Sequence, residues 1–169
     1  MDIYIDRLTA RDTEELYTFE CLNRSFFEEL VPSRGEDYYQ YQNFKIRHTE
    51  LLAEQEKNSS YFFLIKNNTD KIVGRMNLVD IDQHKNEASV GYRIGKEFTG
   101  KGVASKALQL LVEQIRNSSI EKVKAKTTTN NISSQKVLEK NGFNYLRLSD
   151  ETIEWNGQNV KLKYYVLYV

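Results

Sequence analysis

Hydrophobic and polar residues repeat along the chain with two different periods, and together these predict a mixed α/β fold. Alternation with a period of two, or short apolar runs between turn residues, is typical of strands. Such segments are Ile3–Leu8, Tyr61–Ile65, Lys71–Ile81, Ala88–Ile94 and Lys122–Thr127. Strand patterns also fill the chain after Gly142, so the expected order is β-α-α-β-β-β-α-β-α-β-β around one central sheet.

Four segments have helical spacing. The clearest follows Gly102, where apolar residues recur at the spacing of one buried face: Ala104, Leu108, Leu111, Val112 and Ile115. Near the start of the chain, Thr9 or Asp12 can cap a helix that carries Leu16, Phe19 and Leu22 along one face. The other two predicted helices are Tyr38–Glu56 and Asn131–Asn141, and Gly142 ends the last one.

Two turn signals predict hairpins. The segment Asn67–Asp70 separates two strand patterns and predicts an antiparallel pair. Asn156 and Gly157 form the dipeptide that most often closes a two-residue hairpin.

The composition narrows the class of protein. The chain has 169 residues, 40% of them hydrophobic, which suits one domain over residues 1–169. The formal net charge is zero, which argues against a nucleic-acid partner. The charge is uneven, about −6 over residues 1–60 and +6 over residues 61–169. The basic part suits an anionic ligand and the acidic part a cationic one, unless the imbalance is only a random surface feature.

Few residues could hold a metal or form a disulfide. Cys21 is the only cysteine, and His48 and His84 are the only histidines. We therefore expect no metal site, a buried Cys21 in the first helix, and histidines on the surface or on a helix face. The absence of an apolar leader or a membrane-length run predicts a cytoplasmic protein without a membrane partner.

A glycine-bearing loop precedes the best-marked helix. Gly100 and Gly102 flank Lys101, and backbone N–H groups at such a helix start can bind an anion. The spacing is not that of a Walker A loop or of a dinucleotide-binding fingerprint. By itself the loop could equally be a simple turn.

A second motif changes that interpretation. "VGYRI" and "FTGKGVASKAL", followed by "NISSQKVLEKNGF", resemble the GNAT superfamily of N-acetyltransferases. More narrowly, the chain resembles the RimJ/RimL-type branch, which acetylates protein N-terminal α-amines. The resemblance covers nearly the whole chain and implies a GNAT-type α/β (α+β) domain, with helices flanking a mixed sheet that contains a splayed pair of strands.

The resemblance also implies a site for acetyl-CoA as co-substrate, without a metal. The expected pyrophosphate loop is Gly100, Lys101, Gly102, Val103, Ala104 and Ser105. Thr99 departs from the family pattern, which has Gln or Arg there. Tyr92, Arg93 and Ile94 fall on the splayed strand, whose backbone would pair with the pantetheine arm. Asn131 would contact the same arm with its side chain.

Acetyl transfer to an amine needs a general acid and removal of an amine proton. Leu138 stands where many relatives have a tyrosine acid, and the resemblance implies Ser134 as its replacement, although a serine at a helix start can also bond its own backbone. The base is less evident. Some relatives have a glutamate where this chain has Ile153, so neighbouring Glu154 is a candidate, as are Glu151 and Glu87.

The lack of an obvious base favours one kind of acceptor. An α-amine titrates near ~8 and is roughly a tenth deprotonated at neutral pH, whereas a lysine, near ~10.4, is far less so. This favours a protein N-terminus over a lysine.

The alternative acceptors are polyamines, aminoglycosides and other small amines. The protein could also bind acetyl-CoA without catalysis, or it could be an interaction module that does not bind acetyl-CoA. The protein would be a monomer or a homodimer.

Aromatic residues could line an acceptor pocket or pack the core, and nearby acidic residues could attract a cationic amine or simply be solvated. They are Phe26, Phe27, Tyr38, Tyr39 and Tyr41, and Glu28, Glu29, Glu36 and Asp37.

Overall fold

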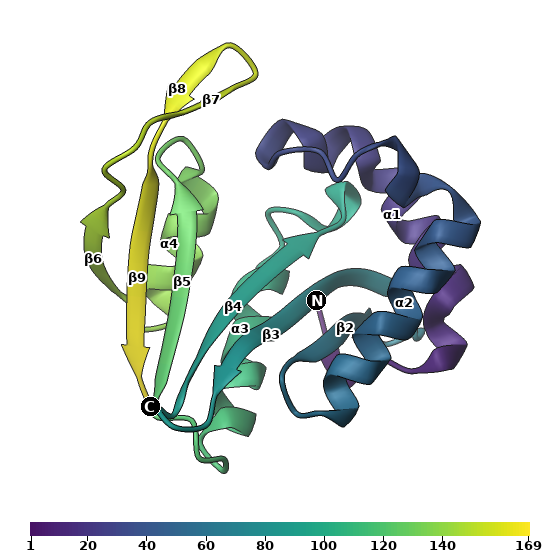
Figure 1. Ribbon diagram of the computed structural model, residues 1–169, viewed down its shortest axis with the longest axis horizontal. Helices are drawn as coiled ribbons and strands as arrows, with labels where there is room; N and C mark the ends of the chain where they lie inside the picture. Colours follow the sequence, from purple (N-terminus) through teal and green to yellow (C-terminus); the bar gives the residue numbers. More distant parts are fainter.

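A mixed sheet of seven strands forms the centre of the protein, with the strand order β1-β2-β3-β4-β5-β9-β6 (Figure 1). The structure is a computed structural model that describes residues 1–169. The strands are β1 (Ile3–Arg7), β2 (Tyr61–Asn67), β3 (Ile72–Asp82), β4 (Glu87–Ile94), β5 (Lys122–Thr128), β6 (Asn144–Leu148), β7 (Ile153–Trp155), β8 (Gln158–Val160) and β9 (Leu162–Tyr168). The helices are α1 (Thr13–Leu30), α2 (Tyr41–Glu56), α3 (Val103–Ile115) and α4 (Ile132–Lys140). The predicted order is confirmed as far as α4, after which the chain forms four strands rather than two.

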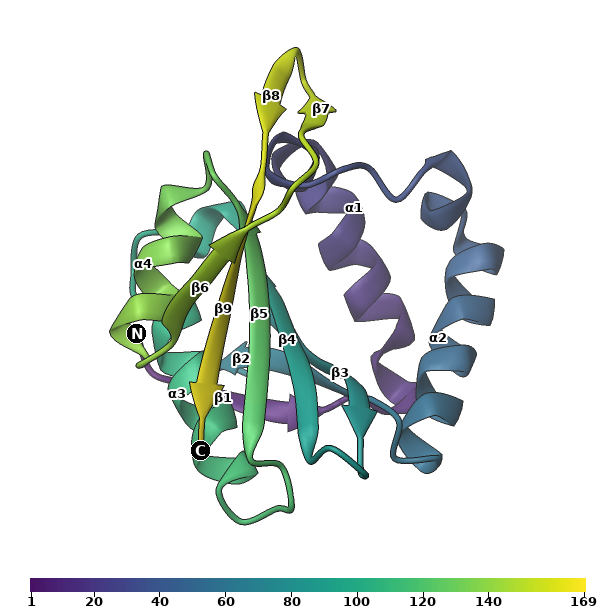
Figure 2. The same ribbon diagram turned by 60° about the vertical axis from the view of Figure 1, so that its left-hand side comes forward.

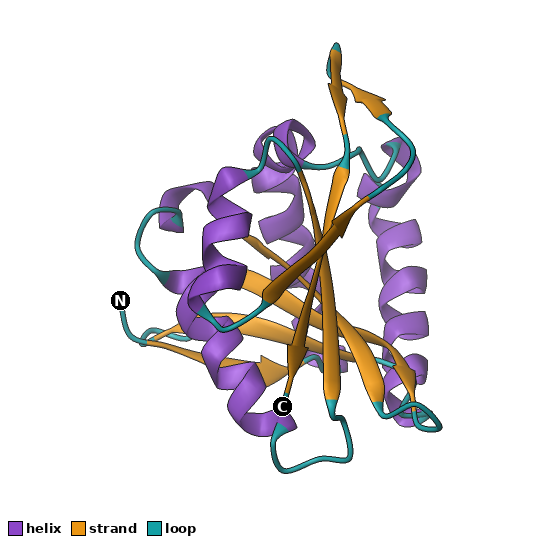
Figure 3. Cartoon of the chain, turned by 90° about the vertical axis from the view of Figure 1, so that its left-hand side faces the viewer, coloured by secondary structure: helices purple, strands orange, loops and turns teal.

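Helices cover both faces of the sheet (Figures 2 and 3). The side chains of β2 show how one strand serves two cores. Phe62 and Leu64 pack with α1 and α2, while Phe63 and Ile65 belong to the core under α3 and α4. This alternation follows from the period of two, and it explains why the strand reads as a continuous apolar run.

The buried face of α3 was predicted correctly for four of its five positions. Leu108, Leu111, Val112 and Ile115 are buried, while Ala104 is only partly covered. Ala104 instead borders a cavity, as described below.

The predictions for α1 were partly wrong. Leu16 and Phe19 are buried, but Leu22 is 80% exposed, and Cys21 is exposed rather than buried. Residue 22 lies six positions after residue 16, which turns it away from the buried stripe of a helix with 3.6 residues per turn.

The predicted helix Tyr38–Glu56 is interrupted at Gln40. A 3₁₀ turn spans Glu36–Tyr39, and α2 starts only at Tyr41 because Gln40 has extended backbone. His48 was expected on the surface or a helix face; it is on α2 but only 3% exposed. Its Nε2 lies 2.8 Å from the carbonyl oxygen of Thr9, so the imidazole ties α2 to the segment before α1.

The Asn-Gly hairpin was predicted correctly. Asn156 and Gly157 both have positive φ, at 50° and 72°, and Trp155 pairs with Gln158 across the turn. These angles suit the two-residue turn that matches strand twist. The hairpin of β7 and β8 forms a separate small sheet.

The strands β4 and β5 diverge, as predicted. They are parallel neighbours, but their pairing covers only Glu87–Ser89 against Lys122–Lys124. Beyond this point β4 continues to pair only with β3, and β5 only with β9. Figure 1 shows the two strands close together near the C-terminus and spread apart at the other end. One backbone edge of each strand is therefore free of a strand partner.

At its diverging end, β4 packs closely against β3. Gly74 of β3 lies opposite Ile94, and a Cβ at Gly74 would meet the carbonyl oxygen of Arg93 at 2.8 Å and Ile94 Cδ1 at 2.9 Å. We expect Gly74→Ala to lower the free energy of unfolding by about 1–3 kcal/mol, because β4 must shift. Urea denaturation measures this loss.

The matched control is Gly91→Ala on β4, where an added Cβ meets nothing within 4 Å. Its stability should be unchanged or slightly raised, because alanine restricts the unfolded chain. Equal stability of the two variants would contradict the role given to Gly74.

Candidate active site

A continuous cleft runs along the splay between β4 and β5. Its inner cavity, of about 350 Å³, is bordered by β3, β4, β5 and the segment after α1. A middle cavity of about 240 Å³ shares Tyr92, Arg93, Asn131 and Ser134 with the inner one. An outer cavity of about 300 Å³ lies at the start of α3 and shares Thr99 and Ala104 with the middle one. The shared lining shows that the three cavities form one path.

The glycine loop at the outer cavity has the geometry of an anion site. Gly100 and Gly102 have φ of 72° and 76°, the left-handed region that favours glycine. Gly102 is the N-cap of α3 and provides no side chain to occupy the first N–H groups of the helix. These amides and the helix dipole are free to bind a phosphate.

The side chains of Lys101, Val103 and Ser105 in this loop have different surroundings. Val103 is buried in the core, so it offers only its backbone to the cavity. Lys101 is exposed, with its Nζ 5.7 Å from the centre of the Phe98 ring. Ser105 lines the cavity, and its hydroxyl accepts a hydrogen bond from Asn141 Nδ2 at 3.1 Å.

Two cations of the outer cavity were missed in the sequence. Lys136 and Lys140 lie one turn apart on α4 and line the same cavity as Gly100 and Gly102. Their spacing of four residues was a readable signal, but only the fold shows that α4 packs beside the start of α3. They add positive charge where an anion would bind.

Thr99, which departs from the family pattern, makes its side-chain hydrogen bond within its own turn. Its hydroxyl donates to the carbonyl oxygen of Lys96 at 2.8 Å. The side chain therefore closes its own turn, although Thr99 still borders the middle and outer cavities.

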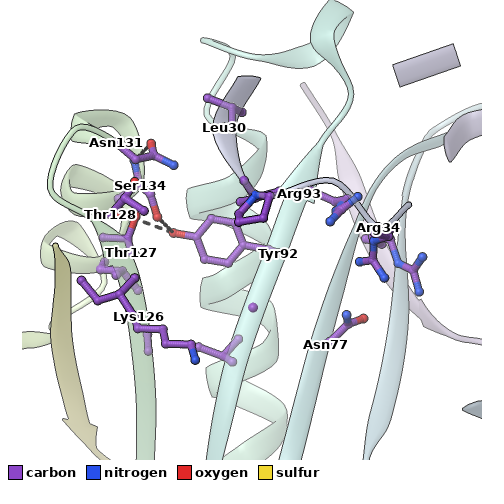
Figure 4. A pocket seen from close by; sticks show the side chains of 18 residues that line it. Leu30, Arg34, Asn77, Tyr92, Arg93, Lys126, Thr127, Thr128, Asn131 and Ser134 are labelled. Atoms are coloured by element: carbon purple, nitrogen blue, oxygen red, sulfur yellow. Dashed lines mark hydrogen bonds between the residues drawn. The ribbon is translucent and has the colours of Figure 1, made fainter. Parts of the chain in front are cut away.

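Ser134 and Tyr92 meet across the cleft (Figure 4). The two hydroxyl oxygens lie 3.2 Å apart, so Ser134 bonds a residue of β4 rather than its own helix backbone. Burial raises the pKa of Tyr92 to about 12, with the hydrogen bond to Ser134 acting in the opposite direction. The phenol therefore stays protonated at neutral pH and can donate a proton to Ser134.

Asn131 begins α4. Its Oδ1 accepts a hydrogen bond from the backbone N–H of Ser134 at 3.1 Å, so the side chain caps the helix. Asn131 also lines the inner and middle cavities, as Ile94 lines the middle and outer ones. Leu138 is buried at the inner cavity and contributes no acid.

The structure brings none of the candidate bases to the cleft. Glu154 is exposed on β7, where it pairs in regular register with Asn159. Glu87 lies where β4 and β5 are still paired, and its carboxylate is 2.9 Å from Lys124 Nζ. Glu151 is exposed between β6 and β7. No aspartate or glutamate lines any of the three cavities.

A buried ion cluster stands at the wall of the inner cavity and was not predicted. Glu20 of α1, fully buried, accepts hydrogen bonds from Arg75 of β3 at 2.8 Å and Arg93 of β4 at 3.1 Å. Burial by itself raises the pKa of Glu20, but Arg75 and Arg93 outweigh it, and the net pKa is lowered. The carboxylate therefore stays ionised and joins α1 to the two strands.

The aromatic and acidic residues near the end of α1 have mixed roles. Phe26 and Phe27 border the middle cavity, whereas Tyr41 packs on Tyr17. Glu28 and Glu36 are both paired with Arg24, at 3.0 and 2.6 Å. These acidic side chains do not line the cleft. The other residues of the set are Tyr38, beside Arg75, Tyr39, under Arg24, and the exposed Glu29 and Asp37.

Comparisons with known proteins agree with this geometry. Residues 2–144 match the family model described as an acetyltransferase (GNAT) domain. The chain is 30% identical over 158 residues to the probable N-acetyltransferase YjcK of Bacillus subtilis (strain 168), covering 92% of this chain and 87% of that protein. The chain therefore belongs to the GNAT acetyltransferase family, whose members transfer the acetyl group of acetyl-CoA to an amine.

Solved structures share the fold. The ribosomal-protein-S5-alanine acetyltransferase of Vibrio fischeri superimposes with a TM-score of 0.90 at 19% identity, over 99% of this chain and 93% of that one. RimL, a ribosomal L7/L12 α-N-protein acetyltransferase in complex with coenzyme A, gives a TM-score of 0.89 at 16% identity, over 99% and 94%. Microcin C7 self-immunity acetyltransferase MccE, in complex with acetyl-CoA and AMP, gives 0.86 at 20%, over 98% and 92%.

None of the helices has the length and apolar character needed to cross a membrane. No three or more His, Cys, Asp or Glu side chains gather as a metal site would require.

The Glu20 cluster generates a stability prediction. Glu20→Gln keeps the shape but leaves Arg75 and Arg93 without a counter-charge, so we expect a loss of about 3–5 kcal/mol in the free energy of unfolding. Denaturation at neutral pH measures this loss. Arg47→Gln, which removes only exposed ion pairs on α2, is the control and should cost less than about 1 kcal/mol.

The Glu20 cluster also makes the free energy of unfolding depend on pH. Because the folded pKa of Glu20 is lowered, its contribution is present above the unfolded value, about 4.3, and is lost as the pH falls through the folded pKa. The stability gap between wild type and Glu20→Gln should therefore narrow in acid. A gap that widens below pH 4 would contradict this assignment.

Proposed function

We propose that residues 1–169 form one acetyltransferase domain that acetylates the N-terminal α-amine of a protein. The observation that carries this proposal is a cleft without a carboxylate in its lining. An α-amine needs less help from a base than a lysine, because roughly a tenth of it is already neutral at pH 7. The solved relatives named for ribosomal-protein acetylation support a protein acceptor, and a cytoplasmic location would suit it.

The outer and middle cavities suit the donor. The amides at Gly100–Ser105, with Lys101, Lys136 and Lys140 nearby, would bind the pyrophosphate of acetyl-CoA. The unpaired edge of Tyr92–Ile94 would pair with the pantetheine arm, and Asn131 lies across the cleft from it. A backbone N–H at this edge would polarise the acetyl carbonyl.

The inner cavity is where acceptor and acetyl group would meet. The neutral amine nitrogen attacks the thioester carbonyl carbon, forming a C–N bond while the C–S bond breaks. The amine proton passes to water, because no side-chain base borders the site. Ser134 donates a proton to the departing sulfur and regains one from Tyr92, which is fully protonated at neutral pH because its pKa is about 12. The tyrosinate then takes a proton from water, which restores the pair.

The donor and the acceptor are tested separately. We expect acetyl-CoA to raise the melting temperature and adenosine to leave it unchanged, because the outer cavity binds phosphate. Thiol release should then be fastest with N-terminal peptides among a panel that includes polyamines and aminoglycosides. Thiol release only with small amines would contradict the proposed acceptor, and binding without any turnover would indicate a silent coenzyme-binding protein.

The proposed acid pair has its own signature. Ser134→Ala and Tyr92→Phe should lower kcat by about 10²–10⁴-fold and about tenfold, with little change in the Kd for acetyl-CoA. Because the pKa of Tyr92 is about 12, kcat/KM should rise with acceptor deprotonation near pH ~8 and then stay level to pH ~10. Ser105→Ala, at the outer cavity, is the comparison variant and should affect binding more than kcat. Unchanged kcat in Ser134→Ala would remove Ser134 from the acid role.

A further inference from the structure

The ion cluster at the inner cavity has more positive than negative charge. Arg75 and Arg93 are cross-strand neighbours, and they share the single carboxylate of Glu20. Like charges placed directly opposite each other destabilise a sheet unless something compensates them. Arg75 is also only 4% exposed, and its Nε has no hydrogen-bond partner.

A third arginine increases the imbalance. Arg34, in the segment between α1 and α2, lines the inner cavity with Arg75 and Arg93, and neither a hydrogen bond nor an ion pair holds its guanidinium. The residue is exposed to solvent, and its guanidinium lies over the ring of Tyr38, 4.9 Å from the ring centre. Desolvation by surrounding protein lowers the pKa of Arg34, and repulsion from Arg93 and Arg75 lowers it further. Attraction to Tyr38 and Glu20 raises this pKa but does not reverse the net lowering.

The rest of the cavity does not neutralise this charge. Lys126 of β5 adds a fourth cation to the lining, which includes no acidic residue. Figure 4 shows Arg34 and Arg93 on one side of Tyr92, with Ser134 and Asn131 on the other. The charge of these two arginines therefore lies on the other side of Tyr92 from Ser134.

Neither packing nor the donor accounts for all these cations. Joining α1 to the sheet needs Glu20 with one or two arginines, whereas Arg34 stacks on the Tyr38 ring and has no hydrogen bond or ion pair to Glu20. The phosphate-type site is separate, because none of the three arginines lines the outer cavity. The charge faces the acceptor side of the cleft, opposite in sign to what a polyamine would need.

We propose that Arg34, supported by Arg75 and Arg93, binds an anionic group that the acceptor carries close to its reacting amine. The group is a carboxylate or phosphate, the partners that guanidinium recognises best. In a protein acceptor this is an acidic side chain within the first few residues. The inference rests on the proposed function and narrows its substrate class.

The test compares peptides that differ in one charge. Each peptide has the same N-terminal residue, whose side chain is uncharged, and carries Glu, Gln or Lys at the second or third position. We expect kcat/KM for the Glu peptide to exceed that for the Gln peptide by at least about tenfold, as one charge-assisted hydrogen bond provides. Equal values, or a preference for Lys, would overturn the inference while leaving N-terminal acetylation intact.

Arg34 is the residue to change, because it can be altered without removing a partner of Glu20. Arg34→Gln should bring the Glu-to-Gln ratio of kcat/KM toward one, and Arg34→Glu should shift the preference to the Lys peptide. Arg116→Gln, an exposed arginine after α3 that removes the same charge, should keep the wild-type ratio. A ratio that is the same in all three variants would overturn the role of Arg34.

A second set of assays uses small amines, and it tests whether the anionic group belongs to a peptide or to a small molecule. Phosphoserine and glutamate are compared with ethanolamine and spermidine. Acetylation of the anionic amines alone would uphold the anion site and overturn the protein acceptor. If nothing is acetylated, the proposed function fails. The inference is then decided by calorimetry with the enzyme–CoA complex, in which the Glu peptide must bind at least about tenfold more tightly than the Gln peptide.

Discussion

The early end of pairing between β4 and β5 is the constraint on which the site depends. After three residue pairs the strands separate, and each has a backbone edge without a strand partner. Such groups need other partners, so this edge is prepared for a ligand. Both strands lead into helices at their diverging ends, which places the first residues of α3 and α4 beside the opening. The anion loop, its lysines and Ser134 are thus brought together by one feature of the sheet.

A second constraint operates behind the cleft. The carboxylate of Glu20 binds arginines from two adjacent strands and fixes α1 against the diverging end of β4. Buried ion pairs contribute little net stability compared with apolar packing, but they are costly to break. Here the cluster also leaves positive charge at the cavity wall. The interaction that orients the helix therefore also determines the electrostatic character of the inner cavity.

Sequence patterns predicted the fold well where local physics decides the outcome. The α3 stripe and the Asn-Gly turn are such cases. The error at Leu22 was one of helical spacing, and the exposure of Cys21 was also not predicted. His48 lies on a helix face, one of its two expected places, but its burial and its bond to the Thr9 carbonyl oxygen depend on tertiary packing. The Tyr92–Ser134 pair and the lysines Lys136 and Lys140 were similarly beyond reach, because each depends on how α4 packs against its neighbours.

By itself, the sequence determined the element order up to α4, the glycine loop and the membership of an acetyltransferase family, because these depend on residue types at fixed local spacing. Only the tertiary structure decided which charges gather at the inner cavity. Glu20, Arg34, Arg75 and Arg93 come from α1, a loop and two strands, and their charges interact only after folding brings them together. Coulombic interactions depend on distance in space and on burial, and neither can be read from spacing along the chain.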